Sequence, residues 1–140
     1  MSALLVAACS DTTAPDHPAG IFVLTSYNGQ SMPFVYVDER MRQTILADTL
    51  YLNGDRSAEM AVTFKTDSLS TGASSVETWR IAYTYKLNWN GFELLYDPPG
   101  ETICICDNDT HNAQFVRDGF VLTMKSSAGE TVYKQYERVQ

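Results

Sequence analysis

The densest group of side chains that could carry out chemistry lies at residues 104–111, CICDNDTH. Two thiolates and His111 are ligands that Zn²⁺ accepts, but the spacing C-x-C-x4-H is not a known structural zinc pattern. On an extended strand, Cys104 and Cys106 would share one face with their Cα atoms about 7 Å apart, near the limit for a disulfide. We expect this disulfide, which an oxidising compartment favours. Two reduced cysteines and a metal site are the alternatives.

The other residues offer little for catalysis. His17 lies in a stretch of prolines and small residues, so His111 is the only histidine in the part of the chain expected to fold. The sequence contains no Gly-x-Ser-x-Gly elbow, no phosphate-binding glycine loop and no dinucleotide fingerprint. We therefore expect that the protein is not an enzyme and uses neither a metal nor another cofactor.

An aromatic row runs along residues 76–89, where large side chains alternate with mostly small or polar ones. Strict alternation predicts a strand that carries all the large residues on one face. Tyrosine and tryptophan combine an apolar body with a polar tip, which suits a cavity for an amphipathic molecule. The predicted ligand-binding residues are Trp79, Tyr83, Tyr85 and Trp89. Core packing is the alternative role for the same row.

The body of the chain from Gly20 onward consists of short runs with high strand propensity, separated by turn dipeptides. The dipeptides that suit a turn with positive φ are Asn28-Gly29, Asn53-Gly54, Asn90-Gly91, Asp118-Gly119 and, more weakly, Ala128-Gly129. About eight or nine strands are predicted between them. One short helical turn at 38–43 is the only helix candidate.

Successive hairpins predict a closed architecture. A long meander of antiparallel strands must protect its edges, and closure into a barrel removes them. We predict an all-β fold, an antiparallel up-and-down barrel of about eight strands, over residues 20–140. A two-sheet β-sandwich is the alternative. The interior of a barrel of this size is filled by side chains or holds one small ligand.

The start of the chain has the pattern of an export signal. Residues 4–9, LLVAAC, run from large apolar side chains through small ones directly into Cys9. This pattern resembles the lipobox of bacterial lipoproteins, in which a cysteine at this position is lipidated after cleavage. Residues 1–8 are then the remnant of a lipoprotein signal peptide, and Cys9 is the lipidation site. A soluble protein with a free thiol is the alternative.

Residues 9–19 have the composition of a tether. They contain no large apolar side chain after Cys9, and two prolines favour an extended, solvated segment. Two or more acyl chains would anchor such a tether stably. Ser10 resembles the outer-membrane sorting pattern of Gram-negative lipoproteins. We therefore expect an outer-membrane lipoprotein of the bacterial cell envelope that faces the periplasm.

The charge balance limits the partners of the protein. The chain has 140 residues, which suits one domain, and a formal net charge of -7 at pH 7. Nucleic acid is disfavoured because its phosphates need a basic surface. An acidic surface permits a basic protein partner.

Two segments of the body resemble small bacterial lipocalin-like lipoproteins. Residues 20–33, GIFVLTSYNGQSMP, resemble their glycine-led first strand followed by an asparagine-glycine turn and a proline. Residues 129–138, GETVYKQYER, resemble their last strand. Phe22 stands where typical lipocalins have a tryptophan. The resemblance implies a calycin-like barrel and a function in binding rather than catalysis.

These features lead to two hypotheses for function. The first is a lipid-anchored extracytoplasmic protein that binds a small hydrophobic or amphipathic ligand in the mouth of the barrel. The second is an envelope lipoprotein that binds a partner protein or inhibits an enzyme. Its contacts would lie in loops 69–75 and 107–112, and its negative charge would steer a basic partner.

Overall fold

The computed structural model describes residues 18–96, 110–126 and 129–139. These ranges contain ten strands: β1 (Gly20–Tyr27), β2 (Gln30–Ser31), β3 (Phe34–Val37), β4 (Met41–Leu52), β5 (Ser57–Ser68), β6 (Ser74–Leu87), β7 (Gly91–Tyr96), β8 (Thr110–Val116), β9 (Gly119–Lys125) and β10 (Thr131–Arg138). Within the same ranges there is no helix of the length and apolar character that crossing a membrane requires.

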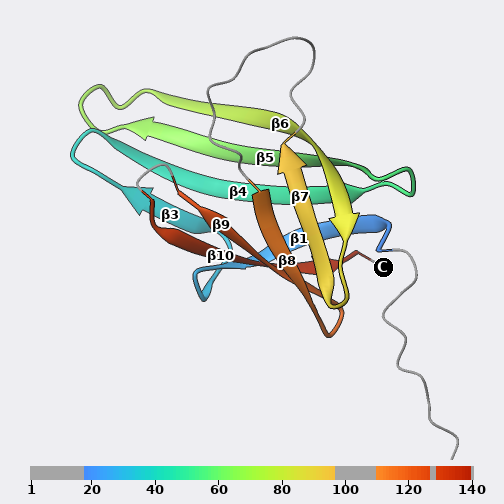
Figure 1. Cartoon of the computed structure of the whole chain (residues 1–140). Helices are drawn as coiled ribbons and strands as arrows, with labels where there is room; N and C mark the ends of the chain where they lie inside the picture. The colour runs from blue at the N-terminus through green and yellow to red at the C-terminus, as the bar shows by residue number, and fades with distance from the viewer. Residues whose placement is uncertain (1–17, 97–109, 127–128, 140) are drawn as a thin grey trace, which may run out of the picture.

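The strands close into a barrel because β1 pairs along both of its edges. Phe22 lies opposite Arg138 of β10 on one side and opposite Leu50 of β4 on the other. From β4 to β10, each strand pairs antiparallel with the next one in the sequence. The result is a closed eight-stranded up-and-down barrel with β2 and β3 as additional strands (Figure 1). This confirms the predicted barrel, an architecture consistent with a lipocalin-like fold.

Glycine has two different roles at the predicted turns. Asn28 and Gly29 both have positive φ, 48° and 79°, as predicted for a tight turn. Gly91 does not, so the prediction of positive φ is wrong there. Instead, a Cβ on Gly91 would lie 1.8 Å from the carbonyl oxygen of Ala113, and Gly119 makes a similarly close approach. These two glycines let neighbouring strands pack tightly.

The helical turn predicted at 38–43 is also wrong. The Asp38 carboxylate accepts hydrogen bonds from the backbone N–H groups of Arg40, at 2.7 Å, and Met41, at 2.8 Å. These bonds lower the pKa of Asp38 and hold a tight turn between β3 and β4. From Met41 onward the chain pairs with β3 and β5. Strand pairing therefore prevails over the local sequence preference.

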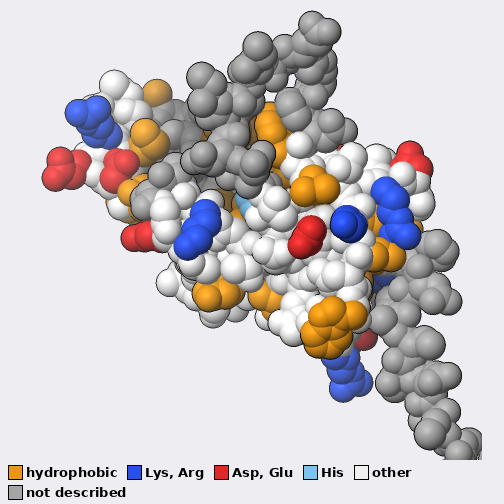
Figure 2. Space-filling model, viewed as in Figure 1, with side chains coloured by type: hydrophobic (Ala, Val, Ile, Leu, Met, Phe, Trp, Pro, Cys, Tyr) orange, Lys and Arg blue, Asp and Glu red, His pale blue; other side chains and the backbone are white. Residues whose placement is uncertain are grey.

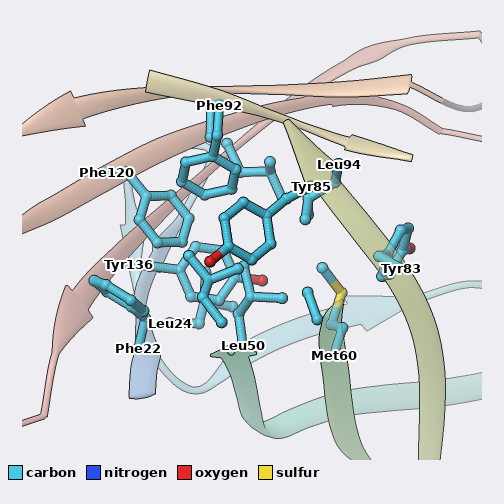
Figure 3. Packing of buried hydrophobic residues seen from close by; sticks show 14 residues of the cluster. Phe22, Leu24, Leu50, Met60, Tyr83, Tyr85, Phe92, Leu94, Phe120 and Tyr136 are labelled. Atoms are coloured by element: carbon cyan, nitrogen blue, oxygen red, sulfur yellow. The ribbon is translucent and has the colours of Figure 1, made fainter. Parts of the chain in front are cut away.

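Side chains fill the middle of the barrel. The Phe120 ring lies 4.9 Å from the rings of Phe22 and Phe92 and 5.0 Å from that of Tyr136, measured between centroids. Figure 3 shows these rings packed against Tyr85 and the aliphatic side chains. Six residues have no exposed surface: Leu50, Phe92, Leu94, Phe120, Leu122 and Tyr136. The centre of the barrel is therefore a packed core.

One end of the barrel, here called the closed end, is formed by the start of β1, the end of β10 and the β4–β5, β6–β7 and β8–β9 turns. The Arg138 guanidinium lies 4.8 Å from the centroid of the Phe22 ring, and Arg56 lies 5.4 Å from that of Tyr85. These cation–π contacts cover the core. A hollow of about 170 Å³ beside Phe22 is smaller than the usual ligand pocket.

At the opposite end, here called the mouth, three strands run beyond the barrel. β6 pairs with β7 only over Tyr83–Leu87, and β4 pairs with β1 only over residues 49–52. Further out, β3 and the outer parts of β4, β5 and β6 form a single-layer sheet, residues 34–46 and 63–80, which we call the flap. It extends to the left in Figure 1. One of its faces, the inner face, continues the interior wall of the barrel.

Candidate ligand-binding site at the barrel mouth

A layer of polar side chains lies inside the barrel towards the mouth. Its members come from β1, β4, β6, β8 and β10, and we call them the polar layer: Tyr27, Asp48, Tyr83, His111, Lys134 and Tyr136. Buried polar groups are costly unless they are hydrogen-bonded or paired. In the described residues, no buried side-chain nitrogen or oxygen lacks a partner. The layer is therefore a satisfied network.

The Asp48 carboxylate is the centre of this network. The Lys134 ammonium donates to its Oδ2 at 2.7 Å, and the Tyr136 hydroxyl donates to its Oδ1 at 2.8 Å. The Asp48 side chain is 0% exposed, whereas that of Lys134 is 9% exposed. The carboxylate is thus fully enclosed, and Lys134 is the member of the pair whose side chain keeps a little exposed surface.

Burial and the nearby carboxylate raise the pKa of two tyrosines of the layer, Tyr136 and Tyr27. The pKa of Tyr136 is raised well above 10.0, first by burial and then by the negative charge of Asp48 and the hydrogen bond to it. Burial and Asp48 also raise the pKa of Tyr27. The Tyr27 ring lies 5.9 Å from the Lys134 ammonium. Both hydroxyls therefore remain hydrogen-bond donors at physiological pH.

His111 and Tyr83 contribute to the layer from β8 and β6. His111 is 6% exposed and Tyr83 5% exposed, and their rings meet edge to face with centroids 5.9 Å apart. Tyr83 is also near enough to Tyr136 to contribute to the raised pKa of Tyr136. The layer therefore reaches from the Asp48–Lys134 pair to strands elsewhere in the barrel wall.

Aromatic and aliphatic side chains lead from the polar layer onto the inner face of the flap. Tyr27 stacks on Phe34 with centroids 4.3 Å apart, and Phe64 meets Trp79 edge to face at 4.8 Å. Ile45 lies opposite both Phe34 and Phe64 in the strand register. Trp79 is 58% exposed. The apolar surface therefore begins beside the polar layer and ends in solvent.

A β-bulge in β4 holds these residues on one side. Side chains alternate along a regular strand, so Ile45 and Asp48 would otherwise face opposite sides. The register between β4 and β5 shifts between Ile45 and Ala47, which leaves Leu46 as the additional residue. Ile45 therefore shares the inner side with Asp48, and the flap continues the barrel interior.

The four aromatic residues predicted to bind ligand do not come together in one place. Trp79 lies on the inner face of the flap and Tyr83 in the polar layer. Tyr85 is buried in the core, with its hydroxyl donating to the carbonyl of Asn53 near the closed end. Trp89 lies in the β6–β7 turn, 89% exposed. Only Trp79 and Tyr83 are therefore available at the mouth.

The other predicted sites fall partly outside the described residues. Three of them lie outside the described ranges: the predicted lipidation site Cys9 and the disulfide candidates Cys104 and Cys106. So do residues 107–109 of one predicted contact loop, while Thr110–Asn112 belong to β8. In the ranges that the structure describes, no three His, Cys, Asp or Glu side chains lie close enough to hold a metal ion.

The central pair of the polar layer was not among the predicted site residues, although the sequence carries a signal for it. Val132, Lys134 and Tyr136 alternate along one strand, so Lys134 occupies a position that should face the core. Asp48 has the same relation to Leu50. A charged residue in the apolar register of a strand indicates a buried pair, but its partner cannot be identified without the barrel closure.

Comparison with known proteins leaves the function open. The sequence matches no protein-family model, and no curated protein is significantly similar to it. A function can therefore be proposed only from the geometry of the mouth.

Proposed function

We propose that this protein binds one small amphipathic molecule at the mouth of the barrel. The apolar part of the ligand would lie on the inner face of the flap, against Phe34, Phe64 and Trp79. Its polar end would point towards the polar layer. One observation carries this proposal: a buried, charged hydrogen-bonding network directly adjoins an aromatic surface that is open to solvent. An amphipathic ligand needs these two environments side by side.

The energetics of the Asp48–Lys134 pair support a role in recognition. Replacing a buried ion pair by apolar residues of similar volume is often neutral or stabilising. A packed apolar core already fills the middle of the barrel. Stability alone therefore gives little reason for a charged pair beside it, whereas recognition of a polar group gives one.

The exposure of Lys134 indicates the polarity of the ligand. Lys134 is the member of the pair that keeps some exposed surface, and the carboxylate oxygens already accept hydrogen bonds from Lys134 and Tyr136. A ligand would therefore meet hydrogen-bond donors first. An anionic or hydrogen-bond-accepting head group fits this arrangement, and a cationic head group does not.

Three molecules with the same hydrocarbon chain test the proposal: dodecanoate, dodecanol and dodecylammonium. We expect saturable binding by calorimetry, strongest for dodecanoate and weakest for dodecylammonium. Trp79→Ala should weaken binding of all three, because it removes apolar contact area. Absence of dodecanoate binding at about 1 mM would refute the proposal.

We further propose that the protein acts outside the cytoplasm, anchored by lipid on Cys9 to the outer membrane of a bacterium. The LLVAAC sequence and the polar tether after it support this address. Labelling the native cells with an alkyne fatty acid should label the wild-type chain but not Cys9→Ser. Equal labelling of both, or recovery of an unlabelled wild-type chain from the cytosol, would overturn the anchoring.

A further inference from the structure

The outer edge of β3 presents unpaired backbone groups. Within the described ranges, β3 pairs only with β4. The Asp38 N–H donates to the carbonyl of Met41 at 3.0 Å, which fixes the alternation along this antiparallel pair. The backbone groups of Phe34 and Tyr36 therefore face β4, and those of Val35 and Val37 point away from it.

This edge has little of the protection that natural edge strands usually carry. Natural proteins place charges, prolines or bulges there to prevent pairing with another chain. No charged residue occurs from Gln30 to Val37, and Pro33 precedes the strand. Val35, Tyr36 and Val37 are 46%, 55% and 52% exposed. The edge is therefore suited to accept another strand.

The flap around this edge carries exposed hydrophobic residues on both faces. Half-exposed hydrophobic residues gather on it: Val35, Tyr36, Val37, Met41, Leu46, Leu69, Val76 and Trp79. Figure 2 shows hydrophobic side chains at several points of the surface, among polar and charged ones. A concentration of apolar surface on a single-layer sheet indicates an interaction surface.

The charge of the flap favours a second copy of the same chain as the partner. The flap carries four basic and four acidic residues: Arg40, Arg42, Lys65, Arg80, Asp38, Glu39, Asp67 and Glu77. Its net charge is therefore zero, although the chain as a whole carries -7. Two copies would repel each other through most of their surface but not through the flap.

We propose that the protein forms a homodimer by antiparallel pairing of β3 with β3 of a second copy. The alternation permits the register in which Val35 lies opposite the partner's Val35, and we propose this one. The N–H of each Val35 then donates to the carbonyl of the other, and the N–H of each Val37 donates to the carbonyl of the partner's Pro33. The missing N–H of Pro33 interrupts none of these four bonds. Phe34 lies opposite the partner's Tyr36, and aromatic pairs stabilise cross-strand contacts.

Hydrogen exchange followed by NMR tests the β3–β3 pairing without a substitution. The Val35 and Val37 amides should exchange rapidly at about 5 µM chain and at least tenfold more slowly at about 500 µM, where dimer dominates. The Tyr36 amide, already paired to β4, should be protected at both concentrations. Fast exchange of Val35 and Val37 at both concentrations would overturn the proposal.

Sedimentation velocity with a matched pair of variants tests the same contact. Val35→Pro removes only an outward-pointing N–H and is tolerated on an edge strand, whereas Val35→Thr keeps the N–H and the branched side chain. The proline variant should raise the dimer dissociation constant at least tenfold, and the threonine variant should not. A monomer at every concentration, or a dimer that survives Val35→Pro, contradicts the proposal. The second result would point to a different self-contact.

Discussion

The two ends of the barrel are made by the same strands but have opposite chemistry. At the closed end, Phe22 and Phe120 pack together and Arg138 covers them. At the mouth, the inward positions hold the buried Asp48–Lys134 pair, and the wall extends into a flap with exposed aromatic residues. One end resembles the core of any small β protein. The other does not.

This difference separates the part of the fold that provides stability from the part that is suited to binding. Burial of large aromatic side chains is the main favourable contribution to folding. A buried ion pair contributes little compared with an apolar replacement. The mouth therefore carries an arrangement that is less favourable for stability and that the proposed recognition of a ligand would explain. Substitutions at the two ends should separate stability from binding.

The largest effect on stability is expected from Phe120→Ala in the packed core next to the closed end. Phe120 is fully buried and contacts the rings of Phe22, Phe92 and Tyr136. Its truncation should lower the free energy of unfolding by about 3–5 kcal/mol in urea denaturation. Phe34→Ala, the same change on the half-buried flap, should cost less than half as much. Equal losses of unfolding free energy would show that the core and the flap contribute equally to stability.

Removal of the ammonium at the mouth should cost slightly less. Lys134→Met leaves the enclosed Asp48 carboxylate with the Tyr136 hydroxyl as its described hydrogen-bond donor, and we expect a loss of about 3 kcal/mol. Adding Asp48→Leu should restore most of the stability, because no buried charge then remains. Dodecanoate binding should stay lost in the double variant. Recovery of binding with recovery of stability would exclude recognition by the pair.

The Tyr136 hydroxyl should affect stability by about 2 kcal/mol, the usual value for a hydrogen bond to a charged group. Because the pKa of Tyr136 is raised in the folded state, its contribution is complete below about pH 10. Above that pH the unfolded chain loses the proton first, so stability falls as pH rises. Tyr136→Phe should be less stable at pH 7 and should show a shallower fall above pH 10. If the unfolding free energies of the wild type and Tyr136→Phe fell in parallel above pH 10, the raised pKa of Tyr136 would be contradicted.

The two tryptophans provide the smallest and most selective comparison. Trp79→Ala at the mouth should weaken dodecanoate binding about tenfold, or about 1.4 kcal/mol, and change the unfolding free energy by less than about 1 kcal/mol. Trp89 at the closed end is 89% exposed, so Trp89→Ala should change neither dodecanoate binding nor the unfolding free energy. If Trp89→Ala weakened binding more than Trp79→Ala, the ligand would lie at the closed end, against the proposal.

Much of the fold could be predicted from the sequence because alternation and turn residues are local signals. The alternating row predicted at residues 76–89 lies in β6 as far as Leu87, with Trp89 in the turn beyond it, and Asn28-Gly29 is a turn with positive φ. Barrel closure was inferred from the need to protect edges and is confirmed. The extension of β4 to β6 beyond the barrel was not predicted, because strand length alone does not show which residues lack a neighbouring strand.

The site was harder to predict for a related reason. Period-two alternation places Trp79, Tyr83, Tyr85 and Trp89 on one side of the chain, but a strand crosses the whole barrel, so its residues reach both ends and the core between them. The Asp48–Lys134 pair joins residues 86 positions apart in the sequence. Such a contact depends on closure and register, and no local pattern encodes it.

The most direct test of binding at the mouth uses each tryptophan as the reporter of its own end. Trp89→Phe leaves Trp79 on the flap as the only tryptophan, and Trp79→Phe leaves Trp89 at the closed end. Titration with dodecanoate should shift the emission of Trp79 to shorter wavelength with saturation, and should leave the emission of Trp89 unchanged. A saturable shift of Trp89 alone, or no shift of either tryptophan, would contradict the account.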